Sequence, residues 1–200
     1  MTLKAAAYAS PHGEDRAIAV NYGTGYLVAV ADGAGGTGHG ALAAERLMNG
    51  ILRMSPSEVG RADWFRRLFA LDDEIARTGG ETTGVVAWVN DGKLRGASVG
   101  DSAAWLIDTQ GNVTDLTVNQ RRRPLLGSGE SIPTIFEADL LGRRLLLMTD
   151  GLWKYVGPQV IVDQVVPACP VSPTVLALAK ATVLPSGDRY DDVGIVLVSP

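Results

Sequence analysis

The stretch VAVADGAGGTGHG, residues 28–40, is an apolar run that stops at Asp32 and opens into five glycines within eight residues. Counted from Gly33, it also matches the pattern G-x-G-x-x-G. The stretch therefore has two interpretations. It is either a loop that cradles the phosphates of a dinucleotide, or a buried strand that delivers Asp32 to a site where glycine permits close approach. The choice decides the fold, because a dinucleotide loop belongs to a parallel βαβ unit.

The dinucleotide interpretation fails on the residues around these glycines. It requires a second parallel strand that ends in an acidic residue about 20 positions later, and residues 53–59 offer Glu58 without a preceding strand. Asp32 would also repel a pyrophosphate, and no Gly-Lys-Ser/Thr follows to make a P-loop. We therefore interpret Asp32 as the functional residue. A nucleotide-binding oxidoreductase stays an alternative, and it predicts a parallel sheet and nicotinamide binding.

The elements on either side of this stretch favour an α+β fold. Short apolar runs between turn formers predict strands at 3–10, 17–22, 26–32, 134–140, 143–150 and 192–199, and a β-meander at 82–116. Helical periodicity predicts helices at 40–54, 62–78, 158–165 and 172–183. Because the strands and helices are segregated rather than alternating, we expect antiparallel sheets with helices on their outer faces. Residues 1–200 are expected to form one domain.

Several local details of this organisation are specific predictions. The turn formers at 11–15 and 23–25 predict that the first three strands form successive hairpins, and Asn90-Asp91-Gly92 predicts another tight hairpin. The helix at 40–54 is predicted to end at Ser55-Pro56. The predicted apolar stripes are Leu42, Leu47, Ile51 and Leu52 in the first helix and Trp64, Leu68, Leu71 and Ile75 in the second.

Charge and cysteine content exclude several classes of partner. The net charge is −4 and the single basic cluster spans 121–123, so the chain lacks the electrostatic footprint of a nucleic-acid binder. Cys169 is the only cysteine, which rules out an intramolecular disulfide and a thiolate metal cage. The N-terminal residues do not read as a leader, and no run approaches about 18 apolar residues. We expect a cytoplasmic monomer that binds neither nucleic acid nor membrane.

Acidic residues recur where apolar strands begin or end. They are Glu14, Asp15, Asp32, Asp101, Asp150, Asp191 and Asp192. Converging carboxylates repel one another unless they are protonated or bound to a cation, and Mg²⁺ and Mn²⁺ suit an all-oxygen site. The chain has two histidines, too few for a typical zinc or di-iron site. Since two such ions about 3.5 to 4 Å apart activate water for attack on phosphorus, the set predicts a phosphohydrolase.

A single Asp-Gly dipeptide is weak support for such a site, because Asp-Gly is also a common turn. The ordered set is more specific. GEDRAIAV, VAVADGAGG, TTGVVAWV, GASVGDSAAWLID, LLLMTDGLW and DRYDDVGIVLV resemble, in order, the motifs of the PP2C-type (PPM) serine/threonine phosphatases, over about residues 5–198. The resemblance implies an α-β-β-α sandwich of two stacked antiparallel sheets with two Mn²⁺ or Mg²⁺ ions at one end. It also implies hydrolysis of phosphoserine and phosphothreonine in proteins by a hydroxide that bridges the ions.

The resemblance assigns a role to individual residues. Asp15, Asp32 and Asp150 are implied as the catalytic metal-binding core. The full set is Asp15 (first ion), Asp32 (bridging both ions), Gly33 (through its carbonyl oxygen), Asp150 and Asp191 (second ion), Asp101 (a weaker third ion) and Glu14 (water around the ions). Trp153 is implied to pack beneath the site.

Two departures from the family concern the groups that handle the substrate. Family members usually carry a phosphate-binding arginine at the position of Ser10, and many carry a histidine, proposed as the general acid, at the position of Ala34. Arg16 or one of the arginines at 121–123 is therefore our candidate for holding the phosphate, because a guanidinium suits its geometry. His39, at the start of the first predicted helix, is a second candidate for contact with the substrate.

Three smaller departures leave the implied metal ligands in place. Ala103 stands where the family usually has arginine, Asp192 stands where it commonly has asparagine, and the segment 117–135 is short. Two alternative functions follow from the departures. Ser10 and Ala34 suit a binding or regulatory module with little catalysis, and the short segment suits a phosphatase of small phosphorylated metabolites.

Overall fold

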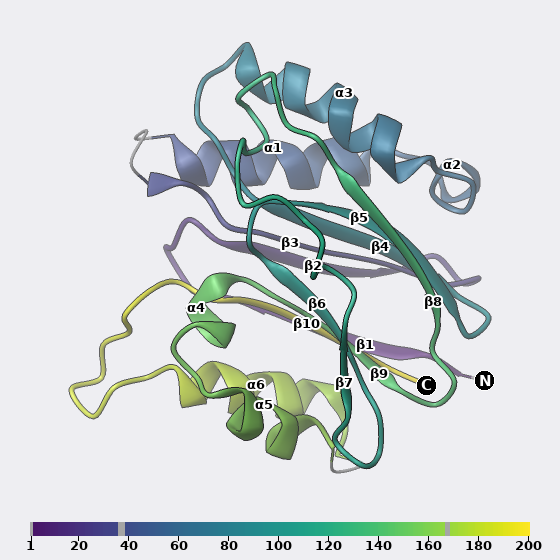
Figure 1. Cartoon of the computed structure of the whole chain (residues 1–200), viewed down its shortest axis with the longest axis vertical. Coiled ribbons are helices and arrows are strands. Elements are labelled where there is room, and N and C mark those ends of the chain that lie inside the picture. The colour runs from purple at the N-terminus through teal and green to yellow at the C-terminus, as the bar shows by residue number, and fades with distance from the viewer. Residues whose placement is uncertain (1, 36–38, 167–168) are drawn as a thin grey trace.

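The computed structural model describes residues 2–35, 39–166 and 169–200. In these ranges, two five-stranded antiparallel sheets lie face to face (Figure 1). The β10 sheet contains, in spatial order, β1 (Lys4–Ala9), β10 (Gly194–Ser199), β9 (Arg144–Met148), β6 (Ala103–Ile107) and β7 (Val113–Asp115). The β3 sheet contains β2 (Arg16–Asn21), β3 (Tyr26–Ala31), β4 (Gly84–Asn90), β5 (Lys93–Val99) and β8 (Thr134–Asp139). The predicted pair of stacked antiparallel sheets is confirmed.

Helices cover the outer face of each sheet (Figure 1). On the side of the β3 sheet lie α1 (Gly40–Leu52), α2 (Pro56–Val59) and α3 (Trp64–Ala76). On the side of the β10 sheet lie α4 (Asp150–Trp153), α5 (Pro158–Val165) and α6 (Val171–Ala181). Among the described residues, no helix combines the length and the apolar character needed to cross a membrane.

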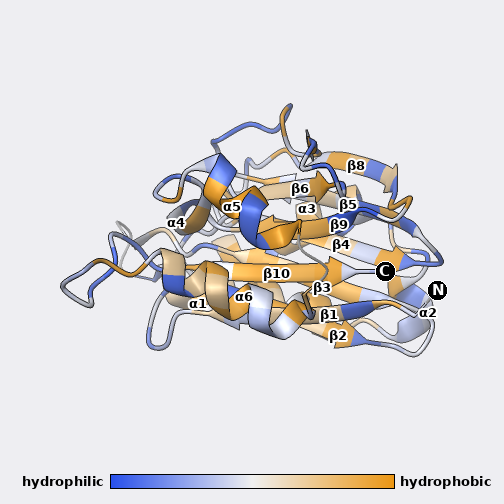
Figure 2. Cartoon of the chain, turned by 90° about the horizontal axis from the view of Figure 1, so that it is seen from below, coloured by the Kyte–Doolittle hydropathy of each residue, from blue (hydrophilic) through white to orange (hydrophobic). Residues whose placement is uncertain are grey.

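Strand β3 is buried on both of its faces, which explains its continuous apolar sequence. Val28 and Val30 belong to the apolar layer between the sheets, together with Val196 of β10. Leu27 and Ala29 point the other way, into the layer under α1 and α3. A strand covered on both faces carries apolar residues at every position rather than at alternate ones. Figure 2 shows the central strands β3 and β10 as hydrophobic ribbons.

The chain crosses between the sheets at two places where the sequence predicted continuous antiparallel pairing. Strand β1 pairs with β10 and β2 pairs with β3, so the predicted hairpin across 11–15 is wrong. Strands β4 and β5 lie in one sheet and β6 and β7 in the other, so the predicted meander is two hairpins joined by a crossing at 100–102. Strands of both sheets are apolar, so local alternation does not say which sheet a strand joins. Both crossings carry acidic residues of the predicted site.

The predicted apolar stripe of the first helix is half right. Leu47 and Ile51 are buried, but Leu42 is 38% exposed and Leu52 is 40% exposed. The buried face is completed by Ala44 and its neighbours, because α1 lies close to the β3 sheet. Ser55, predicted to end this helix, is also the N-cap of α2, where it forms a reciprocal capping box. In α3, the predicted stripe is confirmed as buried, at Trp64, Leu68, Leu71 and Ile75.

Candidate metal centre

Two aspartates face each other at one end of the sandwich because of strand register. Arg16 of β2 pairs with Ala31 of β3, so the next position along the pair sets Asp15 opposite Asp32. Val30 of β3 faces the other sheet, and side chains alternate along a strand. Asp32, two residues later, is therefore directed toward the gap between the sheets. Asp15 beside it is only 3% exposed.

Two further aspartates complete a cluster with Asp32. One carboxylate oxygen each from Asp32, Asp101 and Asp150 lies within 4.8 Å of the other two. Asp101 sits on the crossing between β5 and β6, and Asp150 is the first residue of α4, directly after β9. Asp191 lies in the segment before β10, where burial and then the charge of Asp150 raise the pKa of its carboxyl. Acidic residues from four distant parts of the chain therefore meet at one place.

Burial, followed by repulsion between carboxylates, raises the pKa of Asp32 and Asp101, and burial also raises that of Asp15. Burial, followed by the charges of Asp15, Asp150 and other aspartates, raises the pKa of Asp32 to about 9. Burial is also the main cause that raises the pKa of Asp15 to about 7, against a hydrogen bond with Thr149 that lowers it. The pKa of Asp101 is raised by burial and by Asp150. Without a cation, the fold therefore disfavours the ionised form of these carboxyl groups.

The donor set fits a hard divalent cation. The Asp15 Oδ2 atom is buried and has no hydrogen-bond partner among the described residues, although buried carboxylate oxygens are normally paired or bound to a metal. The clustered side chains offer oxygen atoms only, which Mg²⁺ and Mn²⁺ prefer. His39, one of the two histidines, is exposed at the start of α1. These residues suit Mg²⁺ or Mn²⁺ better than zinc.

The turn that carries Asp15 is bound to the segment that carries Asp191. The N–H of Ser10 donates to the carbonyl of Val193 (2.9 Å), and the N–H of Val193 donates to the Ser10 hydroxyl (3.0 Å). The Asp192 carboxylate accepts a hydrogen bond from the N–H of Glu14 (2.8 Å). Ser10 is buried and its hydroxyl is used within the fold. It therefore joins two loops here and does not replace a phosphate-binding arginine.

The main chain of Asp32 is fixed on both sides. Its N–H donates to the Thr83 hydroxyl (2.9 Å), and its carbonyl accepts from the Thr83 N–H (2.8 Å) and the Thr82 hydroxyl (2.8 Å). Thr82 also bridges Gly33 on one side and Leu126 on the other. The carboxylate of Asp32 is thus presented by a rigid strand end.

Gly33 is required for the close approach of α1. A Cβ atom on Gly33 would lie 2.4 Å from the carbonyl carbon of Gly40, at the first turn of that helix. A Cβ atom on Gly40 would lie 2.6 Å from the carbonyl carbon of Gly33. This contact explains two glycines of the stretch that opens the sequence analysis. Its glycines at 36 and 38 lie outside the described residues.

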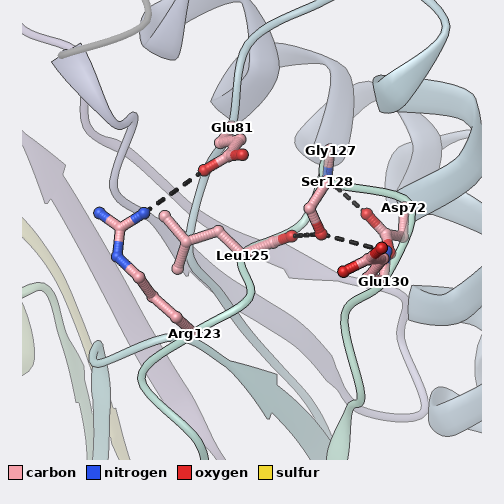
Figure 3. A network of polar contacts seen from close by, with 7 residues as sticks. All are labelled: Asp72, Glu81, Arg123, Leu125, Gly127, Ser128 and Glu130. Atoms are coloured by element: carbon pink, nitrogen blue, oxygen red, sulfur yellow. Dashed lines mark hydrogen bonds and ion pairs between the residues drawn. The ribbon is translucent and has the colours of Figure 1, made fainter.

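The segment 116–133, between β7 and β8, is fastened to α3 by one buried aspartate. Asp72 is 1% exposed, and its carboxylate accepts hydrogen bonds from three N–H groups of this segment. These belong to Gly127, Gly129 and Ser131. Figure 3 shows the contact with Gly127, and also the ion pair of Arg123 with Glu81 (3.7 Å). The segment that the sequence comparison with the family identified as short is therefore held against the body of the protein.

The remaining predicted residues lie around the cluster. Arg16 donates to the carbonyls of Gly13 and Asp15, both at 2.8 Å, so its guanidinium supports the turn that carries Asp15. Glu14 lies close to Gly35, where a Cβ atom would come within 2.7 Å of its Oε2 atom. Among the described residues, neither Arg16 nor Glu14 forms an ion pair with the aspartates. Their predicted roles toward substrate and water stay predictions.

Lys154 and Trp153 contact the cluster from α4 and its end. The Trp153 indole N–H donates to the carbonyl of Asp101 (3.0 Å), so this side chain holds the main chain of Asp101 while it packs against the apolar cluster of the β10 sheet and its helices. The Lys154 Nζ atom lies 3.4 Å from Asp150 Oδ2. The sequence analysis missed Lys154. Its spacing of four residues after Asp150 is the signal that would have revealed it, because residues four apart share a helix face.

Gly151→Ala tests the packing of α4 against the segment before β10. A Cβ atom at this position would lie 1.8 Å from the carbonyl oxygen of Asp192, so one of the two segments must shift. We expect a loss of about 3 kcal/mol in the free energy of unfolding, measured by urea denaturation. Gly157→Ala is the matched control, since its Cβ atom meets nothing within 4 Å. Equal stability of the two variants would contradict this packing.

Comparison with known proteins identifies the fold. No protein-family model and no curated protein sequence matches the chain. Serine/threonine phosphatase Stp1 from Staphylococcus aureus is 19% identical, with a TM-score of 0.83 over 100% of this chain and 96% of that chain. The Mycobacterium tuberculosis serine/threonine phosphatase PstP/Ppp is 22% identical, with a TM-score of 0.81 over 100% and 99%. A PstP catalytic domain solved with two manganese ions is 21% identical, with a TM-score of 0.78 over 98% and 97%. The chain therefore has the fold of the PP2C-type phosphatases.

Proposed function

We propose that this protein is a metal-dependent phosphatase that removes phosphate from phosphoserine and phosphothreonine in proteins. The observation that carries the proposal is the convergence of Asp32, Asp101 and Asp150 within 4.8 Å, with Asp15 and Asp191 beside them. Such a set of oxygen ligands has no evident structural purpose, because burying it costs stability unless a cation is bound.

In this proposal, different residues of the cluster would hold each of two Mn²⁺ or Mg²⁺ ions. Asp15 and the Gly33 carbonyl would hold the first ion, Asp150 and Asp191 the second, and Asp32 both. Asp101 would hold a weaker third ion. When bound, such ions lower the pKa of water and offset the negative charge of the phosphoryl oxygens. The chain's own contribution is to fix these carboxylates near the ends of strands before the substrate arrives, most firmly at Asp32.

The solved structures with the same fold support this proposal without deciding it. Stp1 and PstP are serine/threonine phosphatases, and one PstP structure contains manganese. A second candidate function is hydrolysis of small phosphorylated metabolites. The observation that favours it is that the segment 116–133 is held against α3 through Asp72. It therefore offers little free chain to contact a protein substrate.

The test is hydrolysis of para-nitrophenyl phosphate against Mn²⁺ concentration, with a chelator control, followed by phosphopeptides and small phosphoesters. We expect turnover that rises with Mn²⁺, disappears with the chelator, and has a higher kcat/KM for phosphopeptides. A higher kcat/KM for small phosphoesters would favour the second candidate. A folded protein without turnover at any Mn²⁺ concentration would contradict both and favour a binding module.

A further inference from the structure

A phosphate that approaches this cluster needs positive charge beyond the metal ions. The site contains at least five carboxyl groups, and a phosphate monoester is itself a dianion near neutral pH, so the two repel. The Nη1 atom of Arg16 donates to two main-chain carbonyls, which hold this guanidinium against its own turn, and Ser10 is buried and accepts a hydrogen bond from the N–H of Val193. A cation that contacts the carboxylate cluster directly is therefore a better candidate for holding the phosphate than either residue.

Lys154 is the cation that directly contacts the cluster among the described residues. Its Nζ atom lies 3.4 Å from Asp150 Oδ2. The Lys154 side chain is 53% exposed, whereas the Asp150 side chain is 13% exposed. The ammonium group therefore sits at the boundary between the buried carboxylates and the solvent, where a phosphate would enter. Arg122 lowers the pKa of Asp101 electrostatically, but within the described part of the chain the two side chains are not close enough to form an ion pair.

Two tyrosines restrict the position of this ammonium group. The Lys154 Nζ atom lies 5.6 Å from the centre of the Tyr155 ring, within the range of a cation–π interaction. The Tyr155 ring stacks on Tyr190, with centroids 5.1 Å apart and an angle of 17° between the planes. Tyr190 immediately precedes Asp191. The stack thus ties the segment that carries Asp150 to the segment that carries Asp191, and the Lys154 ammonium group lies against the Tyr155 ring of this stack.

From these contacts we infer that Lys154 binds the phosphate group of the substrate, an inference that rests on the proposed phosphatase function. An ammonium group has three N–H donors, so it keeps Asp150 as one partner and donates to phosphoryl oxygens with another. The contact exists with substrate and product alike, because both present phosphate oxygens. Lys154 therefore sets the affinity for phosphate more than the rate of the chemical step.

The experiment compares Lys154→Met, Lys154→Arg and Lys180→Met with the unaltered protein in saturating Mn²⁺. Lys180→Met is the matched control, because Lys180 is an exposed lysine in the last turn of α6. The readouts are KM and kcat for para-nitrophenyl phosphate, and the Kd of inorganic phosphate by calorimetry. For Lys154→Met we expect KM and the phosphate Kd to rise about 10-fold or more, with a smaller change in kcat. For Lys154→Arg and Lys180→Met, we expect KM and the phosphate Kd to stay within about 3-fold of the values of the unaltered protein.

Calorimetry keeps this inference separate from the proposed function. If the unaltered protein has no turnover but binds phosphate in a Lys154-dependent way, the phosphatase proposal fails and the binding role stands. Unchanged phosphate Kd and KM in Lys154→Met would overturn the inference. A Mn²⁺ titration adds a second way to overturn it. If Lys154→Met gains a Mn²⁺ ion while its phosphate Kd is unchanged, the ammonium group stands in for a cation and does not bind the substrate.

Discussion

Asp32→Asn is expected to lower kcat/KM for para-nitrophenyl phosphate on the order of 10³-fold. Asp32 faces Asp15 through strand register and shares a 4.8 Å cluster with Asp101 and Asp150, so in the proposed function both ions would depend on it. Asparagine keeps the size of the side chain but removes its charge. Steady-state kinetics across Mn²⁺ concentrations is the measurement, because excess metal should not restore the rate.

Asp91→Asn is the matched control for this prediction. Asp91 is also followed by glycine, but it lies in the hairpin between β4 and β5, with a φ of 50°. Asparagine tolerates this left-handed conformation well, so stability and activity are expected to stay unchanged. If Asp32→Asn retained more than about a tenth of the activity, Asp32 would not be a ligand shared by the two ions.

The sequence predicted which acidic residues form the site better than it predicted how the chain runs between them. The apolar run before Asp32 predicted a buried strand that delivers a carboxylate, because residue type and length are local properties. Which sheet each strand joins is decided by packing across the sandwich. Residues 11–15 therefore read as a hairpin turn, although they carry the chain from one sheet to the other. The antiparallel arrangement itself followed from the segregation of strands and helices.

Residues whose role depends on hydrogen bonds to partners far away in the sequence could not be predicted. Asp72 lies in the middle of an amphipathic helix, where the sequence pattern gives an acidic residue no special meaning. Only the fold brings three N–H groups to it from 127–131. Ser10 was judged by the arginine it replaces, and its own bond to Val193 depends on two loops 183 residues apart. The strand ends indicated the set of carboxylates and the resemblance to a family gave them roles, but neither revealed the residues that support them.

The cluster makes a second large prediction, on the stability of the metal-free protein. The pKa of Asp32 rises from 3.8 to about 9 in the folded state, and that of Asp15 rises to about 7. The folded state therefore binds these protons more tightly than the unfolded state. The stability this provides is complete below about pH 4 and is lost as the pH rises through the folded pKa values. Each of these two carboxyl groups lowers the free energy of unfolding by at most about 1.4 kcal/mol for each unit of rising pH.

Comparison with Asp32→Asn isolates this effect from the other titrating groups. In the chelated state, we expect the unaltered protein to lose stability relative to Asp32→Asn between pH 5 and about 8, as followed by Tm. At pH 8, Mn²⁺ at about 100 times its Kd should increase the free energy of unfolding by about 2.7 kcal/mol. This corresponds to a rise in Tm of roughly 5–10 °C for a chain of this size. The variant should respond much less, since it lacks the shared carboxylate. Parallel pH curves for the two metal-free proteins would mean that burial and the neighbouring carboxylates do not raise the pKa of Asp32, and would remove the physical reason to place a cation there.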